Sequence, residues 1–155
     1  MDLKMSNFKE KIAFVCQRYG LEVTGGAEME CRQYAEALTK EYDVEVYTTC
    51  ALDYVTWANS YPWGTFRING VTVHRFHVEK QRENQSFNKL CSHVLMSSSH
   101  SDEEEEQWID AQGPICPQLL KVLYQRQDEY KAVLFMTYLY YPTIKGLRMG
   151  FKNAL

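Results

Sequence analysis

The stretch IAFVCQRYGLEVTGGAEMECRQYAEAL, residues 12–38, carries the local pattern that decides the fold. It begins with an apolar run, Ile12 to Cys16, of the kind found in strands that are buried on both faces of a parallel sheet. Two adjacent glycines follow, and the apolar residues after them recur at the spacing of one helix face. The order strand, glycine loop, helix directs backbone N–H groups and the positive end of a helix dipole at the space above the strand, where the usual ligand is an anion such as a phosphate.

Two further segments extend this unit into a sheet. We expect the first helix over Glu28 to Glu41 and a second strand over Val44 to Thr49, because its β-branched residues favour extended structure. Strand, helix and strand in this order form a βαβ unit with a right-handed crossover. A third core strand is expected over Ala132 to Thr137. The sequence therefore predicts an α/β fold, a Rossmann-like doubly wound parallel sheet with the Ile12 strand central and helices on both faces.

The middle of the chain predicts a hairpin followed by helical and polar segments. Two β-rich runs, Phe66 to Ile68 and Val71 to Phe76, are joined by Asn69-Gly70, the strongest short signal for a β-hairpin. We expect this hairpin at the margin of the sheet. Phe87 to Met96 is compatible with a helix. Residues 97–106, SSSHSDEEEE, offer no apolar face, so a solvated loop or a mobile helix start is expected there.

Two more helices are expected in the last third of the chain. Gly113-Pro114 breaks the chain before the first of them. That helix ends near residues 128–130 and has apolar residues at helical spacing: Leu119, Leu120, Leu123 and Tyr124. The last helix is expected to start within Ile144 to Met149.

Composition limits the classes of protein to consider. A chain of 155 residues with 45% hydrophobic residues can bury one core, so we expect one domain. The net charge of -3, with Lys and Arg scattered along the chain, gives no basic surface for nucleic acid. The five cysteines include no CxxC pair, which fits small buried side chains in a reducing compartment.

The apolar segments are too short for a membrane protein. The first eleven residues, MDLKMSNFKEK, lack the apolar core of a secretory signal. The longest apolar stretch, Ala132 to Tyr141, falls well below the length of a bilayer span. We therefore expect a cytoplasmic protein, for which peripheral association with a membrane remains open.

Other residues with chemical potential do not form a recognisable site. His74 and His77 are three residues apart on an expected strand and so point to opposite faces, and His93 and His100 lie in the variable middle. We therefore expect no metal and no cofactor. The acidic run 103–106 reads as a solvated charge block rather than as an acid and base pair.

The glycine pair, Gly25 and Gly26, matches neither the GxGxxG dinucleotide fingerprint nor the GK[ST] ending of a P-loop. Two interpretations stay open on the local pattern. The glycines either serve only to turn the chain into the helix, with Thr24 or Gly25 as N-cap, or form an anion or sugar site. Glu28 and Glu30 lie in the first helical turn and partly satisfy the dipole, so a bound anion would require both to turn outward.

Three segments in order carry a resemblance to a known family. The string KIAFVCQRYGLEVTGGAEMECRQYAEALTKEYDVEVYTT, residues 11–49, resembles the opening of family-4 glycosyltransferases, with a GGAE-type loop, a helix with an A-x-x-L ending and a V-x-V-x-T strand. Ile68 to Phe76 is similar to the family's G-V-x-V-x-R-F segment, and Ala132 to Leu147 to its next core strand and helix. Residues 81–115 resemble the family weakly or not at all.

The resemblance implies a GT-B architecture, in which two Rossmann-like domains face each other across a cleft. Residues 1–155 would be the amino-terminal, acceptor-side domain, ending before its last strands and without the carboxyl-terminal donor-binding domain of the same enzyme, its expected partner. The implied reaction is retaining, hexosyltransferase-type transfer from a nucleotide sugar to a glycan or small-molecule acceptor, needing no cofactor. Because groups from both domains are needed, we expect this chain alone to be inactive.

The resemblance also assigns roles to particular residues. The loop near the donor diphosphate and sugar would consist of Gly25, Gly26 and Ala27. Residues expected at the cleft or near the acceptor are Tyr19, Thr49, Thr137 and Tyr138. Side chains on the two glycines would block the approach of backbone N–H groups to the ligand, and we also expect dihedral angles there that favour glycine.

Two other classes of function remain as alternatives. The first is a non-catalytic Rossmann-like domain that binds a ligand or associates with another polypeptide. The second is an unrelated α/β enzyme such as a nucleotide-dependent dehydrogenase, which the missing fingerprint and the lack of an acidic residue at the end of VEVYTT disfavour.

Overall fold

A five-stranded sheet with the order β3-β4-β2-β1-β5 forms the centre of the computed structural model, which describes residues 8–155. The strands are β1 (Lys11–Val15), β2 (Asp43–Thr49), β3 (Gly64–Ile68), β4 (Val71–Phe76) and β5 (Tyr130–Phe135). β1 pairs in parallel with β2 and with β5, β2 pairs in parallel with β4, and only β3 runs antiparallel to its neighbour. The predicted parallel core with β1 between the other two expected strands is confirmed.

The hairpin of β3 and β4 lies at the edge of the sheet, as the Asn69-Gly70 pair predicts. Both turn residues have positive φ angles, 47° at Asn69 and 85° at Gly70. Such turns match the twist of the flanking strands, and asparagine and glycine adopt them more readily than other residues. The turn therefore sets the register, in which Ile68 faces Val71.

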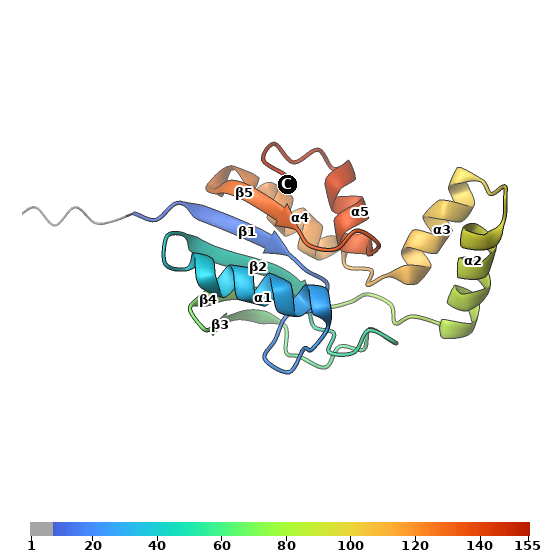
Figure 1. The fold of residues 1–155 in the computed structure, drawn as a ribbon, viewed down its shortest axis with the longest axis horizontal. Helices are drawn as coiled ribbons and strands as arrows, with labels where there is room; N and C mark the ends of the chain where they lie inside the picture. The colour runs from blue at the N-terminus through green and yellow to red at the C-terminus, as the bar shows by residue number, and fades with distance from the viewer. Residues whose placement is uncertain (1–7) are drawn as a thin grey trace, which may run out of the picture.

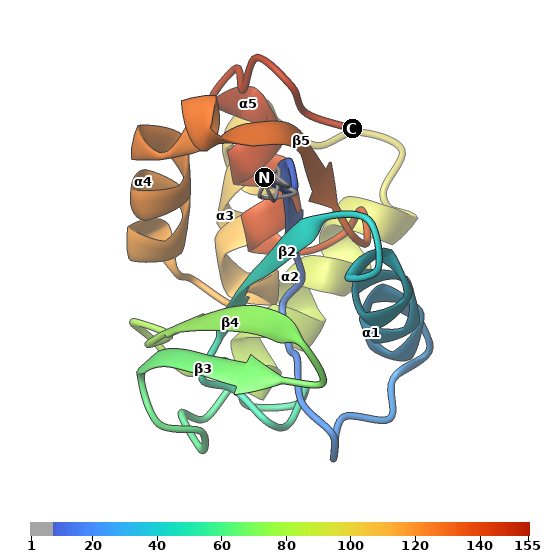
Figure 2. The ribbon, with the colours of Figure 1, turned by 90° about the vertical axis from the view of Figure 1, so that its left-hand side faces the viewer.

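Helices cover both faces of the sheet (Figure 2). One face carries α1 (Gly26–Leu38), and the other carries α4 (Pro117–Gln125) and α5 (Tyr141–Arg148), with a short 3-10 turn, η1 (Gln127–Glu129), after α4. Ile12 and Phe14 of β1 pack with buried residues of α1, whereas Ala13 and Val15 pack with buried leucines of α4. Because successive strand residues point to opposite faces, both faces of β1 are buried, as the continuous apolar run predicts. The doubly wound α/β fold is thus confirmed.

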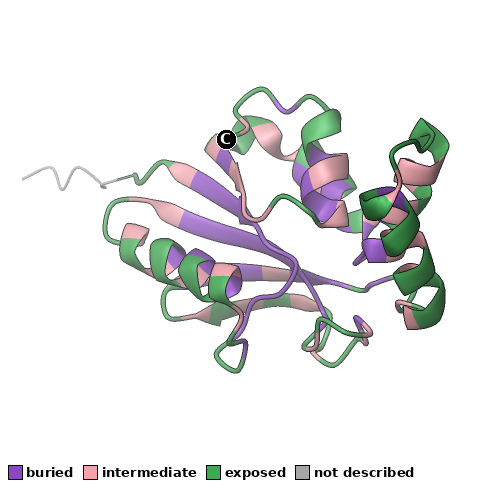
Figure 3. Cartoon of the chain, turned by 45° about the vertical axis from the view of Figure 1, so that its right-hand side comes forward, coloured by how far each residue is buried: buried purple, intermediate pink, exposed green. Residues whose placement is uncertain are grey.

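Two further helices lie beyond the carboxyl ends of β1 and β5 (Figure 1). α2 (Asn84–Met96) and α3 (Asp102–Gln112) form a helical hairpin, and α3 also contacts α5. Most of this hairpin is exposed, in contrast to the buried central strands (Figure 3). None of the helices within residues 8–155 is long and apolar enough to cross a membrane. The expectation that no secretory signal is present concerns residues 1–11, of which residues 1–7 lie outside the described part of the chain.

The acidic stretch is a helix start rather than a solvated loop. α3 begins at Asp102, and Ser101 forms a capping box with Glu104, in which Ser101 Oγ accepts from the Glu104 backbone N–H at 3.2 Å and the Glu104 carboxylate accepts from the Ser101 N–H at 2.8 Å. Acidic side chains in a first turn also interact favourably with the helix dipole. Ile109, further along α3, is buried, so this helix does place an apolar side chain away from solvent.

A buried carboxylate ties four segments together on the α4 face. Glu45 of β2 is only 4% exposed. Its carboxylate accepts from Lys11 Nζ at 3.0 Å, His74 Nε2 at 2.6 Å, Arg126 Nη1 at 3.1 Å and the Tyr130 hydroxyl at 2.7 Å. Burial opposes ionisation of Glu45, but the hydrogen bonds from His74, Tyr130 and Lys11 outweigh it and hold the pKa of Glu45 well below its ordinary value.

Replacing Glu45 with glutamine should lower the free energy of unfolding by about 1–3 kcal/mol, because Lys11 and Arg126 would lose the carboxylate but keep their ion pairs with Glu129. A folded-state pKa below the unfolded value gives stability that is present above about pH 4.3 and is lost as the pH falls further. Urea denaturation at pH 7 and at pH 3.5 measures both effects, and the loss of stability on acidification should be smaller in E45Q than in the original chain.

The matched control is Glu10→Gln, which removes an exposed carboxylate that pairs with Lys131. Exposed pairs contribute about 0–1 kcal/mol, so this variant should unfold almost like the original chain. Equal stabilities of E45Q and E10Q at pH 7 would contradict the role assigned to Glu45.

Candidate functional site

The candidate site lies at the point where the chain stops adding strands on one side of β1 and begins to add them on the other side. From β1 the chain moves to β2 and β4 on one side, and it returns to β5 on the other side of β1. In open α/β sheets, ligands bind at the carboxyl ends of the strands at such a switch point. The loop after β1 and the start of α1 lie at this edge, together with the segment after β5 (Figure 1).

A buried ion pair organises this edge. One oxygen of Glu28, Oε1, accepts from Arg18 Nη2 at 2.6 Å, Arg18 Nε at 2.9 Å and Gln17 Nε2 at 2.9 Å. Arg18 is 7% exposed and also donates through Nη1 to the backbone oxygen of Leu52 at 2.9 Å. Glu28 therefore points inward, toward the end of β1. Glu28 is not turned outward, and Arg18 neutralises its charge inside the protein. That a bound anion requires Glu28 to turn outward stays a prediction.

The two glycines of the loop play different structural roles. Gly25 is the N-cap of α1 and has an ordinary extended conformation, with φ -63° and ψ 144°. A Cβ atom on Gly25 would overlap the Glu28 carboxylate and would lie 2.8 Å from Arg18 Nη2. Gly26, the first residue of α1, is exposed, and nothing lies within 4 Å of the position that its Cβ would take.

Neither glycine has a positive φ angle. The expectation that the dihedral angles of the loop favour glycine is therefore corrected. Glycine is needed at position 25 because the ion pair lies so close to the backbone that a side chain would not fit. At Gly26 the structure gives no steric or conformational reason for glycine, and open solvent lies above it. Ala27, the third residue expected in this loop, is half-buried.

The four residues expected at the cleft divide into two groups. Thr49 is buried, and its hydroxyl donates to the backbone oxygen of Gln17 at 2.6 Å; Tyr19 is also buried. Thr49 thus holds the loop after β1 through a hydrogen bond, and Tyr19 packs in the buried core. Thr137 has a positive φ of 74° and donates to Gln17 Oε1 at 3.0 Å, whereas Tyr138 is 79% exposed. The structure thus brings Thr49 and Thr137 together around Gln17, whereas Tyr138 is exposed to solvent.

Gln17 and Arg18 were not among the expected site residues. Both follow directly after β1, and two long polar side chains at the end of a buried strand are the signal that sequence reasoning overlooked. Gln17 uses both ends of its amide, since Nε2 donates to Glu28 and Oε1 accepts from Thr137. It therefore connects the loops after β1 and β5 across the switch point.

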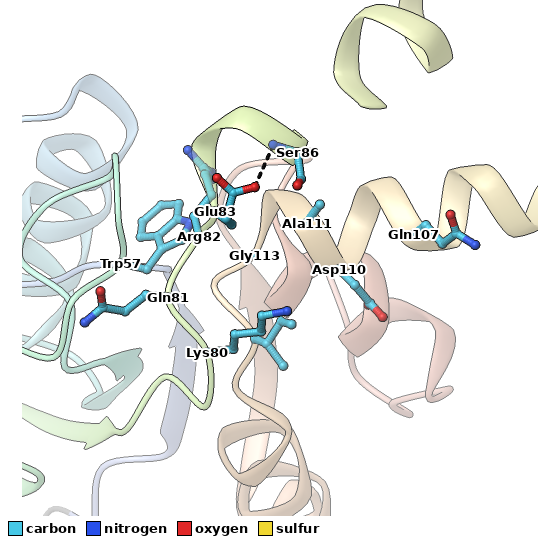
Figure 4. A pocket seen from close by; sticks show the side chains of 11 residues that line it. Trp57, Lys80, Gln81, Arg82, Glu83, Ser86, Gln107, Asp110, Ala111 and Gly113 are labelled. Atoms are coloured by element: carbon cyan, nitrogen blue, oxygen red, sulfur yellow. Dashed lines mark hydrogen bonds between the residues drawn. The ribbon is translucent and has the colours of Figure 1, made fainter. Parts of the chain in front are cut away.

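A pocket of about 400 Å³ lies between α3 and the segment after β4 (Figure 4). Trp57 forms part of its wall, and its indole N–H donates to the backbone oxygen of Gln112 at 2.8 Å. Tyr140 packs edge-on against Trp57 at 5.4 Å, and burial followed by the charge of Glu28 raises the pKa of Tyr140. Tyr140 thus connects the pocket with the switch point. The polar residues of the lining are Lys80, Gln81, Arg82, Glu83, Ser86, Gln107 and Asp110.

The described residues hold no group of three or more His, Cys, Asp or Glu side chains that could bind a metal ion. Four of the five cysteines are buried, and all five are free thiols. Comparison with known protein families, with curated proteins and with solved structures finds no significant match to this chain.

The two glycines allow a matched test of this geometry. Gly25→Ala should lower the free energy of unfolding by about 1–3 kcal/mol, the usual cost of overpacking, because the new methyl group displaces the Glu28 carboxylate. Gly26→Ala should leave it unchanged or raise it by about 0.4–1 kcal/mol, because alanine restricts the unfolded chain and fits a helical position in open space. Thermal and urea unfolding of the two variants measures the difference, and equal stabilities would contradict the packing described here.

Proposed function

We propose that this chain is the amino-terminal, acceptor-side domain of a retaining glycosyltransferase with GT-B architecture. Together with a donor-binding domain it would transfer a sugar from a nucleotide sugar to a glycan or small-molecule acceptor. The observation that carries the proposal is the open amino-terminal end of α1 at the switch point, with Gly26 exposed and unobstructed. A ligand oxyanion can approach the backbone there without meeting a side chain.

The chemistry of the proposed site follows from the end of the helix. Backbone N–H groups at Gly26 and Ala27 lie in the first turn of α1, where the four leading N–H groups have no partner within the helix. In glycosyl transfer, negative charge develops on the diphosphate as it leaves, and preorganised N–H donors stabilise such charge. Because Arg18 neutralises Glu28, the inward carboxylate does not repel this leaving group.

The pocket beside Trp57 supports a place for the acceptor. Its volume of about 400 Å³ lies within the range of small-molecule sites. Amide, carboxylate and ammonium groups in its lining (Gln81, Gln107, Asp110 and Lys80) offer both donors and acceptors, which suits the hydroxyl groups of a sugar or polyol. The aromatic side chain of Tyr138 is exposed after β5 and adds a surface on which a sugar ring can stack.

Titration of the 15N-labelled chain with UDP-glucose, GDP-mannose and ADP-glucose tests the proposal. At least one of these donors should shift the backbone amide signals of Gly25, Gly26, Ala27 and Thr137 in a saturable way, because its diphosphate approaches the start of α1. Gly26→Trp should weaken this response by about tenfold or more, the loss expected when roughly 1.4 kcal/mol of contact is blocked. The matched control is Lys40→Trp, which adds the same side chain at an exposed position beyond the other end of α1.

An equal response in G26W and the original chain would contradict the proposal, as would the absence of a saturable response to all three donors when a donor-binding domain is joined to the chain. The chain by itself is expected to hydrolyse none of the donors, since catalysis requires groups from both sides of the cleft. Turnover by the chain above the G26W background would show that the activity resides in this domain alone. Binding that persists without transfer when a donor-binding domain is joined to the chain would favour the alternative, a non-catalytic binding domain.

A further inference from the structure

Arg75 is a buried cation without an acidic partner. It is the second-last residue of β4 and lies on the α1 face of the sheet, two residues after the buried Val73. Its side chain is 6% exposed, but within residues 8–155 it forms no ion pair. Nη2 donates to the backbone oxygen of Tyr19 at 3.0 Å, and Nε is buried with no hydrogen-bond partner. A guanidinium carries five N–H donors, and the donor at Nε is buried here without a partner.

Arg18, the other buried arginine described at this edge, has the acidic partner that Arg75 lacks within residues 8–155. Arg18 is equally buried, and the Glu28 carboxylate accepts two of its hydrogen bonds. Burying a charge without a partner costs several kcal/mol, so buried arginines are normally paired. Burial lowers the pKa of Arg75, which reflects the same uncompensated charge. Within residues 8–155, no acidic side chain forms an ion pair with Arg75 to offset this cost.

An aromatic side chain covers this guanidinium. The Tyr61 ring lies over Arg75 at 3.7 Å from the ring centroid, and the Phe66 ring lies at 5.3 Å. The Tyr61 hydroxyl donates to Glu22 at 2.5 Å, and burial together with this hydrogen bond raises the pKa of Tyr61 to about 12. The charge of Glu22 acts on Arg75 at a distance, but the two side chains form no ion pair within residues 8–155, and Tyr61 hydrogen-bonds to Glu22 and stacks on Arg75.

Gly20 provides the space in which Tyr61 lies. A Cβ atom on Gly20 would overlap the Tyr61 hydroxyl and would lie 2.8 Å from the ring carbon that carries it. The Tyr61 side chain is partly exposed, so it can rotate toward solvent about its own side-chain bonds. Its departure would open a slot between Gly20, which has no side chain, and the guanidinium of Arg75.

We propose that Arg75 binds the oxyanion of a ligand, a phosphate or a carboxylate, which enters the slot beside Gly20 when Tyr61 rotates away from it. The anion accepts hydrogen bonds from the guanidinium, and charge-assisted bonds of this kind are the strong ones. The hydrogen bond from Tyr61 to Glu22 holds the site closed in the absence of ligand. This site combines Arg75 at the end of β4 with Tyr19 and Gly20 of the loop after β1, whereas the proposed transfer site is the start of α1 at Gly26. It does not depend on the glycosyltransferase proposal.

The test uses inorganic phosphate and acetate as probes, each titrated at constant ionic strength against potassium chloride. The observed signals are the Nε–H group of Arg75 and the ring of Tyr61 in the NMR spectrum of the labelled chain. We expect a saturable shift of both signals with at least one of the two anions and none with chloride. A response to phosphate alone identifies a phosphate ligand, and a response to acetate alone identifies a carboxylate ligand.

Three variants distinguish this site from general attraction of anions. Arg75→Gln should abolish the response of the Tyr61 ring, whereas Arg67→Gln, which removes an exposed arginine on the neighbouring β3, should leave it unchanged. Tyr61→Phe keeps the ring over the guanidinium but loses the bond to Glu22. The Arg75 signal in this variant should report an affinity for the anion that is about two- to tenfold tighter, because opening the site no longer requires one hydrogen bond to be broken.

The proposal is overturned if neither anion gives a saturable shift, or if R75Q binds as well as the original chain. It is also overturned if the affinity of Y61F equals that of the original chain. If R75Q does not fold, the comparison of Y61F with the original chain and with R67Q decides the question. No nucleotide sugar is used, so failure here leaves the proposed transfer function standing, and failure of the donor titration leaves this site standing.

Discussion

The ion pair between Arg18 and Glu28 is the interaction on which the carboxyl edge of this protein depends. It joins the residue pair after β1 to the first turn of α1, and one carboxylate oxygen accepts three hydrogen bonds. The pair is buried, so removal of either partner would leave a charge in a medium of low polarity. This constraint fixes the path of the loop between strand and helix, and it explains why the chain needs a residue without a side chain at Gly25.

The two ends of the sheet differ in how their charges are satisfied. Near the amino ends of the strands, Glu45 receives hydrogen bonds from two cations, a histidine and a tyrosine, so this network is closed and its role is to stabilise the fold. At the carboxyl ends, Arg75 forms no ion pair within the described residues 8–155, and the start of α1 is open. Large apolar side chains are also exposed on the loops at this edge: Leu21, Leu52, Tyr54, Trp63 and Tyr138. Unsatisfied polar groups and exposed aromatic rings at this edge are the features on which we propose it as the functional one.

The fold could be predicted from the sequence because its signals are local. Continuous apolar runs predicted the parallel strands, and Asn69-Gly70 predicted the edge hairpin, since strand burial and turn geometry depend on neighbouring residues. The site could be predicted only in part. Its position after β1 followed from the glycine loop, but the inward direction of Glu28 depends on Arg18, ten residues away. The role of Gly25 likewise depends on a packing contact and not on its own dihedral angles.

A double-mutant cycle on Arg18→Met and Glu28→Gln tests the central claim most directly. The free energies of unfolding of the original chain, both single variants and the double variant give the coupling energy between the two side chains. If the ion pair organises the edge, the losses of stability in the two single variants add up to more than the loss in the double variant. The difference, which is the coupling energy, should be at least about 1.5 kcal/mol. Additive effects, with a coupling of less than about 0.5 kcal/mol, would contradict the account, because residues that do not interact behave in that way.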